Sequence, residues 1–206
     1  MKSILLHPVY FGPVTQFIAM ANAEKIIFEY EDNYQKQTYR NRMYIYGANG
    51  KLTLNIPVKH TPSSGHRKYK DVEIENDFKW QQLHWRSLEA AYRSSPFFEF
   101  YEDDIQPLYE PKFKYLLDFN YHCLEVISDC LQMDFQFEKT NEYQLNPENV
   151  LDLRKLSDAK KAKTIPSYKQ VFESKNGFLP NLSILDLLFN EGNNSENYLK
   201  TAKLNL

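Results

Sequence analysis

Two arginines flank an asparagine at the point where a β-hairpin is expected to begin. The run YRNR places Arg40, Asn41 and Arg42 just before the stretch MYIYGANGKLTLNIPV. Paired guanidinium groups bind carboxylates and phosphates through two parallel hydrogen bonds. Charged side chains on an edge strand also protect a sheet against aggregation, so the pair has a purely structural alternative. If the arginines bind a ligand, they form a local anion site in a chain whose formal net charge is only -2.

One histidine and several carboxylates supply groups that could transfer protons. His7 follows the apolar run SILL, and Glu29, Glu31 and Asp32 follow the run KIIF. Histidine titrates near neutral pH, which suits it to accept and donate protons. Hydrogen bonds to the backbone would explain His7 equally well, and solvation would explain the glutamates. We take His7 as the candidate catalytic base and Glu29 and Glu31 as candidate substrate contacts.

The elements that position these groups begin with a strand, a helix and a second strand. The run SILLHPVYF predicts a strand that ends near His7, Pro13 opens a helix over PVTQFIAMANA, and residues 25–30 form the next strand. Such a βαβ unit favours parallel pairing. Because ligands bind beyond the carboxyl ends of parallel strands, we expect His7 and the acidic residues to meet there. The N-terminus of the helix would assist anion binding at the same edge.

A hairpin follows, with Asn49-Gly50 supplying its turn. The hydrophobic sets of the two strands must face one core, because a slip of one residue would invert one of them. The opposite face then carries Arg40, Arg42, Tyr44, Tyr46, Asn55 and Lys59. If the first hairpin strand runs antiparallel to the strand before it, Arg40 and Arg42 return to the edge near His7. Arg40, Asn41, Arg42 and Lys59 are therefore candidate substrate contacts.

The rest of the chain is predicted to be mostly helical. Helices are expected over residues 80–95, 95–106 and 112–133 and from Asn181 or Ser183 to Gly192, with a strand within residues 134–143. Residues 145–165 are charged and contain no glycine, so we expect a mobile surface segment. The fold class is α/β, a mixed sheet that starts with the βαβ unit and the hairpin and packs against several helices. We expect one domain over residues 1–206.

Composition and motif content exclude several functions. A chain with this charge has no general attraction for nucleic acid, and it contains no run of roughly 18–20 apolar residues that would span a membrane. No secretory leader is evident, so we expect a cytoplasmic protein. The five histidines lack metal-ligand spacing, which predicts no metal site. The P-loop and dinucleotide motifs are absent, and the cofactor and oligomeric state stay unknown.

Other polar residues have a structural explanation as well as a functional one. His84 lies one helical turn from Trp80 and from Leu88, and Asn120 lies on an apolar stripe, so both favour the core. Cys123 and Cys130, without a CxxC partner, are also typical of core packing. The basic loop TPSSGHRKYK, residues 61–70, is either a solvated loop or a phosphate clamp.

Several blocks of the chain resemble the WbqC-like family of bacterial proteins. HPVYFGP is similar to the family opening His-Gln-Pro-x-Tyr-x-Pro, although Pro8 stands where glutamine would follow His7. The resemblance continues through the YRNR start of the hairpin, LNIPV, WQQLHW, SPFF and YKQVF, and LPNLSILDLLFNEG is similar to Bacteroidetes members. Glu29-Tyr30-Glu31 departs from the acidic pair of many relatives. The resemblance covers the chain except residues 132–167 and adds Tyr10, the signature tyrosine, to the candidate substrate contacts.

The family takes its name from O-antigen gene clusters, and the resemblance implies a role in the synthesis of cell-surface polysaccharide. We expect a transferase of a small activated group, such as an amino-acyl group, that takes an anionic or sugar-linked small molecule. A non-catalytic protein that binds a ligand or a partner is the first alternative. A nucleotidyl-transfer enzyme is the second, by analogy with a histidine placed between a strand and a helix N-terminus.

Overall fold

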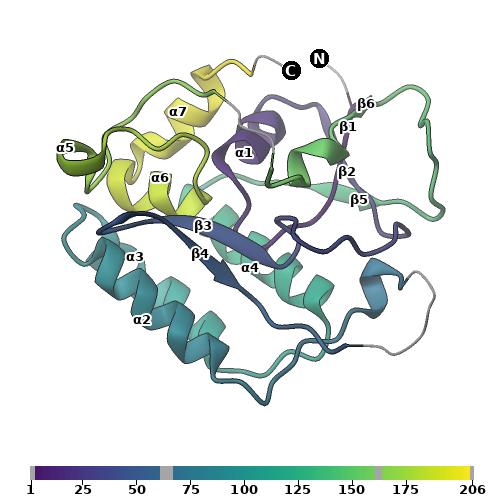
Figure 1. The fold of residues 1–206 in the computed structure, drawn as a ribbon. Helices are drawn as coiled ribbons and strands as arrows, with labels where there is room; N and C mark the ends of the chain where they lie inside the picture. The colour runs from purple at the N-terminus through teal and green to yellow at the C-terminus, as the bar shows by residue number, and fades with distance from the viewer. Residues whose placement is uncertain (1–2, 61–66, 161–163, 205–206) are drawn as a thin grey trace.

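A computed structural model describes residues 3–60, 67–160 and 164–204 (Figure 1). Its largest sheet has four parallel strands in the order β5-β2-β1-β6. β1 (Ser3–Leu6) and β2 (Lys25–Phe28) lie side by side, and α1 (Val14–Ala21) connects them. The predicted βαβ unit is therefore confirmed. His7 directly follows β1, so the carboxyl end of the sheet begins at this residue.

The outer strands come from the second half of the chain. β5 (Phe137–Lys139) pairs with β2 and confirms the strand expected within residues 134–143. β6 (Leu151–Asp152) pairs with β1, and the short 3-10 helix η3 (Arg154–Ser157) follows it. Residues 145–165, expected at the surface, thus contribute a strand to the sheet, and Leu153 and Leu156 are buried in the core. The mobility of this segment stays a prediction.

β3 (Arg42–Gly47) and β4 (Gly50–Asn55) form the hairpin in the expected register. Met43 lies opposite Leu54, and Arg42 lies opposite Asn55, so the apolar and polar sets occupy separate faces. The hairpin makes a two-stranded sheet of its own, because β5 and β6 already occupy the two edges of the β1–β2 pair. The α/β class is confirmed, with parallel and antiparallel pairing divided between two sheets.

α2 and α6 pack against β3 of the hairpin, and η3 packs against β1 of the parallel sheet (Figure 1). The longer helices are α2 (Trp80–Tyr92), α3 (Phe98–Ile105), α4 (Leu116–Leu131), α6 (Ile184–Glu191) and α7 (Asn194–Thr201). The short ones are η1 (Tyr69–Asp71), η2 (Gln106–Tyr109) and α5 (Glu173–Asn176). The oxygen of Ser183 accepts a hydrogen bond from the N–H of Leu185, and Gly192 follows the last residue of α6 with a φ of 54°. The predicted cap and stop of this helix are both confirmed.

One cluster of buried side chains runs from β1 to the end of α7 and contains most of the aromatic rings in the core. Cys123 is buried within it and Cys130 packs against it, as expected of core cysteines. No helix in the described part of the chain is long and apolar enough to cross a bilayer.

Candidate functional site

A cavity of about 480 Å³ lies beyond the carboxyl ends of β1 and β2. Its lining comes from three parts of the chain. His7 and Asp32 follow the two central strands, residues 35–38 belong to the loop before the hairpin, and the third part runs from Tyr143 to Lys160. This is the edge at which the βαβ argument predicts a ligand.

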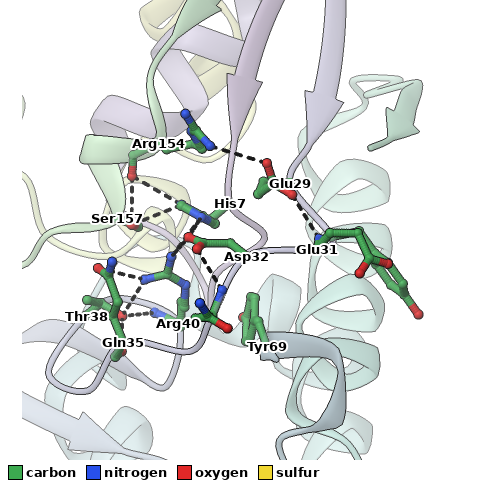
Figure 2. A network of polar contacts seen from close by, with 12 residues as sticks. His7, Glu29, Glu31, Asp32, Gln35, Thr38, Arg40, Tyr69, Arg154 and Ser157 are labelled. Atoms are coloured by element: carbon green, nitrogen blue, oxygen red, sulfur yellow. Dashed lines mark hydrogen bonds and ion pairs between the residues drawn. The ribbon is translucent and has the colours of Figure 1, made fainter. Parts of the chain in front are cut away.

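His7, Asp32 and Arg40 form a close triangle beside the cavity (Figure 2). The Nε2 atom of His7 is 2.8 Å from Oδ2 of Asp32 and 2.7 Å from Nη2 of Arg40. That nitrogen of Arg40 also donates to Oδ2 of Asp32 at 3.0 Å. The structure therefore brings His7 and Arg40 together across 33 positions of sequence, as predicted, although β3 belongs to a separate sheet and does not pair with β2.

Arg40 is completely buried, which changes what it can do. Its Nη1 atom donates to the side chains of Gln35 and Thr38, and its Nη2 atom faces His7 and Asp32. It does not line the cavity, so the guanidinium is placed to position His7 and Asp32. Direct contact of Arg40 with a substrate stays a prediction that this geometry does not favour.

The second ring nitrogen of His7 faces the η3 segment. Nδ1 is 3.3 Å from the carbonyl oxygen of Arg154 and 3.4 Å from Oγ of Ser157 (Figure 2). Arg154 and Ser157 were not among the predicted site residues, because their segment was expected at the surface. The run VLDL, residues 150–153, with three apolar residues of four, was the available signal for a strand that would bring η3 to His7.

Burial controls the protonation of this cluster. It lowers the pKa of His7 to about 4, against the hydrogen bond to the carboxylate of Asp32, and the charge of Arg40 adds to the lowering. Burial alone would raise the pKa of Asp32, but the hydrogen bond with His7 and the charges of His7 and Arg40 lower it below its usual value. At neutral pH the cluster therefore holds a neutral imidazole, a carboxylate and a guanidinium.

The triangle leaves two arrangements for the proton of the neutral imidazole. With the proton on Nε2, His7 donates to Asp32, and Nδ1 presents a lone pair to Ser157. With the proton on Nδ1, Nε2 accepts from Arg40, and Nδ1 donates to the carbonyl of Arg154. In both, Arg40 stays bonded to Asp32. The contacts with Arg40 and with the carbonyl of Arg154 are both hydrogen bonds only in the second arrangement, because a guanidinium cannot accept and a carbonyl cannot donate. The first arrangement is the one that leaves a basic nitrogen facing a hydroxyl, with the Nε2–H shared between Asp32 and the space beside Arg40.

Arg154 holds part of the cavity lining in place through hydrogen bonds to several segments. Its guanidinium contacts Asp152 through Nε at 2.9 Å and Nη2 at 2.7 Å, and its Nη1 lies 3.4 Å from Oε2 of Glu29. It also donates to the carbonyl oxygens of Gln144 and Leu145. Glu29, fully buried, does not line the cavity. Its place in the structure is that of a partner for Arg154, and substrate contact by Glu29 stays a prediction.

Tyr10 lies in the core behind the hairpin. Its hydroxyl is 2.7 Å from the hydroxyl of Tyr109 and 2.9 Å from Nδ1 of His84. The other nitrogen of His84 lies 3.1 Å from the carbonyl of Asn55, and burial lowers the pKa of His84 to about 4. His84 is thus a bonded core histidine, as the core alternative predicts. Asn120 is likewise a bonded core group, since its Nδ2 donates to the carbonyl of Arg40 at 2.7 Å.

The remaining candidate contacts lie outside the cavity lining. Oε1 of Glu31 lies 2.5 Å from Nζ of Lys70 in η1. Nζ of Lys59 lies 3.0 Å from Oε2 of Glu73. Asn41 donates to a backbone carbonyl of the segment after β4, and Arg42 is half-buried at the start of β3. Substrate contact by Glu31, Asn41, Arg42, Lys59 and Tyr10 stays a prediction.

The N-terminus of α1 and the basic loop over residues 61–70 were both considered as anion sites. The prediction that the N-terminus of α1 assists is wrong, because its first amides are already bonded. The N–H groups of Val14 and Thr15 donate to the carbonyl of Leu182 and to Oδ1 of Asn181, both at 3.0 Å. The basic loop over residues 61–70, for which a solvated loop and a phosphate clamp were both considered, lies partly outside the described residues, since residues 61–66 are not among them. Within the described ranges, no group of three or more histidine, cysteine or acidic side chains is arranged to hold a metal ion.

Comparison with known proteins gives a consistent assignment. The model of the WbqC-like protein family matches residues 8–165 and 159–198. An uncharacterized protein of Mycobacterium tuberculosis, Rv1507c, is 26% identical over 218 residues, which cover 91% of this chain and 92% of that protein. No solved structure gives a significant match. The similarity to Bacteroidetes members stays a prediction. Because the family match spans nearly the whole chain, the protein belongs to the WbqC-like family.

Proposed function

We propose that this protein is a cytoplasmic transferase that moves a small activated group, such as an amino-acyl group, in the synthesis of cell-surface polysaccharide such as O-antigen. The resemblance to a family named from O-antigen gene clusters supports the pathway. The chemistry is supported by one observation above all. His7, neutral at pH 7, lines a cavity while its two nitrogens contact Asp32 and the η3 segment.

In this proposal His7 takes the proton of an amine or hydroxyl as that group attacks the activated donor. A general base must be unprotonated at the working pH and fixed within hydrogen-bonding distance of its partner. Burial meets the first condition, and the contacts with Asp32 and Arg40 meet the second. Asp32 stabilises the imidazolium that forms, and Arg40 is a positioning residue that holds Asp32.

The charge of the cavity lining favours an anionic donor. Lys36, Lys155 and Lys160 line it, and none of the three forms an ion pair with another described residue. Of the three carboxylates in the lining, two are bound by Arg40 and Arg154. The lysines therefore outnumber the one remaining carboxylate, which attracts phosphate or carboxylate groups.

The lining also has an apolar side. Tyr143 is 43% exposed and Leu145 is 72% exposed, and the guanidinium of Arg154 lies 5.1 Å from the centre of the Tyr143 ring. An exposed tyrosine beside an exposed leucine gives the ring of a sugar or a nucleoside a surface to pack against. A donor with a ring at one end and a phosphate at the other, such as a sugar-linked nucleotide, fits both features.

The test combines ligand-induced stabilisation with turnover. A ligand at 100 times its Kd stabilises a protein by about 2.7 kcal/mol, which a thermal melt detects. Wild type should be stabilised by a sugar nucleotide or an acyl phosphate, and His7→Gln should keep much of this stabilisation but lose transfer to an added amine. His122→Gln is the control, since His122 is an exposed histidine paired with Glu125. Equal transfer by His7→Gln and wild type would reject His7 as the base.

The second candidate is a binding protein without catalysis. It is favoured by the pKa of His7 near 4, which makes a weak base, and by the complete burial of Arg40. Saturable binding of a sugar nucleotide without transfer to any amine or alcohol acceptor would select this candidate over the transferase.

A further inference from the structure

Ser157 completes a line of three functional groups at the cavity. Its Oγ lies 3.4 Å from Nδ1 of His7, and on the other side of the ring Nε2 lies 2.8 Å from Oδ2 of Asp32 (Figure 2). All three residues line the cavity. A hydroxyl, an imidazole and a carboxylate in this order form the arrangement that activates serine for nucleophilic attack, and unrelated folds reach it from different chain orders.

We propose that Ser157 is a nucleophile that accepts the acyl group of the donor and holds it as an ester before transfer. The donor class is an activated carboxylic acid, namely an ester, a thioester or an acyl phosphate. This inference rests on the proposed function, because it uses the same cavity and the same histidine.

Among the hydroxyl residues of the described cavity lining, Ser157 is the one in contact with His7. Thr38 donates to the carbonyl of Gln35 and accepts from Arg40, so its oxygen is committed to the positioning network. Ser157 is bonded locally instead. Its Oγ donates to the carbonyl of Arg154 at 2.8 Å, which is the usual local bond of a serine in a short helix.

That local bond does not hold the hydroxyl away from the imidazole. The carbonyl oxygen of Arg154 is itself 3.3 Å from Nδ1 of His7, so both acceptors of the hydroxyl proton lie on the same side of Ser157. Rotation of the hydroxyl about the Cβ–Oγ bond of Ser157 turns its proton from one acceptor to the other. The hydroxyl is therefore poised between a resting bond and a reactive one.

The acyl transfer needs only His7, Ser157, the donor and the acceptor. With the proton on Nε2, Nδ1 accepts the proton of Ser157 as Oγ forms a bond to the acyl carbon. The bond from the acyl carbon to the leaving group breaks, the leaving group takes the electron pair, and Nδ1 returns the proton to it. An amine or hydroxyl of the acceptor then attacks the ester and gives its proton to His7. Ser157 recovers that proton as its oxygen leaves.

Serine-directed reagents test this inference without knowledge of the substrate. The full chain is treated with a small fluorophosphonate and, separately, a small sulfonyl fluoride, and the products are analysed by intact mass and peptide mapping. We expect one label, on Ser157, that is absent from Ser157→Ala and forms at least tenfold more slowly in His7→Gln. Ser87→Ala is the matched control, because Ser87 is a half-buried serine outside the cavity whose Oγ donates within α2. The absence of label from wild type, or an equal rate in His7→Gln, would overturn the inference.

A cysteine in place of Ser157 covers the case in which His7→Gln does not fold. In Ser157→Cys the thiol should react with iodoacetamide at pH values well below those needed by Cys130, because the imidazole takes its proton. Peptide mapping separates the two, and equal pH profiles would count against the inference. A wrong assignment of Ser157 can also be told apart from a wrong proposed function. If Ser157→Ala still transfers the acyl group, the nucleophile is wrong and the base stands, whereas wild type that binds no donor refutes the proposed function itself.

Discussion

Asp32→Asn removes the charge between His7 and Arg40 while keeping the shape of the side chain. Arg40 is completely buried and lies 3.0 Å from Oδ2 of Asp32, so the substitution leaves a buried guanidinium without its counter-charge. Loss of one partner of a buried ion pair costs about 3–5 kcal/mol. The side chain of Asp32 keeps 11% exposure at the cavity, which places the expected loss near the lower end, at about 3 kcal/mol. In a chain of this length about 1 kcal/mol corresponds to about 2–4 °C, so Tm should fall by roughly 6–12 °C.

The measurement is urea denaturation at pH 7.5 together with a thermal melt of the same samples. Glu138→Gln is the control, because Glu138 and Lys25 form an exposed ion pair at 2.7 Å, which contributes about 0–1 kcal/mol. Arg40→Met added to Asp32→Asn should recover part of the loss, since it removes the uncompensated charge. A loss below about 1 kcal/mol for Asp32→Asn, no larger than for the control, would refute the account of Arg40 as a buried charge held by Asp32.

Three other predictions concern pH, the lysines of the cavity lining and the glycine that ends α6. A change from pH 7.5 to 5.0 should lower the free energy of unfolding by about 4 kcal/mol, because His7 and His84 have a pKa of about 4 when folded and 6.5 when unfolded. Over this pH range the unfolded chain binds more protons than the folded one, and a urea midpoint that does not change with pH would contradict the prediction. Lys155→Glu with Lys160→Glu should weaken pyrophosphate binding by at least tenfold in calorimetry, whereas Lys112→Glu, at an exposed position outside the cavity, should not. Gly192→Ala should destabilise the fold by about 1–3 kcal/mol, because the new Cβ would lie 2.6 Å from the ring of Phe97. Gly177→Ala shares the strain of a positive φ but meets open space, so it should cost less in the same melt.

Local sequence patterns were sufficient for the elements whose pattern repeats over short distances. Alternation and the Asn49-Gly50 turn predict the register of the hairpin, and the parallel βαβ unit places His7 at the carboxyl edge of the sheet. The contact between His7 and Arg40 was predicted from a hairpin strand antiparallel to β2, but the hairpin forms a sheet of its own, so the contact comes from how the hairpin packs and not from strand pairing. These parts could be predicted because few alternative chain paths satisfy them.

The rest depended on contacts between distant segments. Ser157 lies 150 positions from His7, and β6 is only two residues long, so the run VLDL can indicate a strand but not its pairing with β1. The free N-terminus expected for α1 was wrong for the same reason, since the amides are bonded by residues 181–182, far along the chain. Burial of Arg40 behind His7 likewise depends on how the hairpin packs, which the charge pattern of YRNR does not reveal.

Imidazole NMR of the protein labelled at histidine tests the central claim most directly, while pyrophosphate and then a sugar nucleotide are added. If His7 lies at the ligand site, its ring resonances should shift at saturation and its pKa should rise from about 4 as the anion offsets the charge of Arg40, while His84 stays unchanged. Saturable binding that leaves the His7 resonances and pKa unchanged would contradict the account.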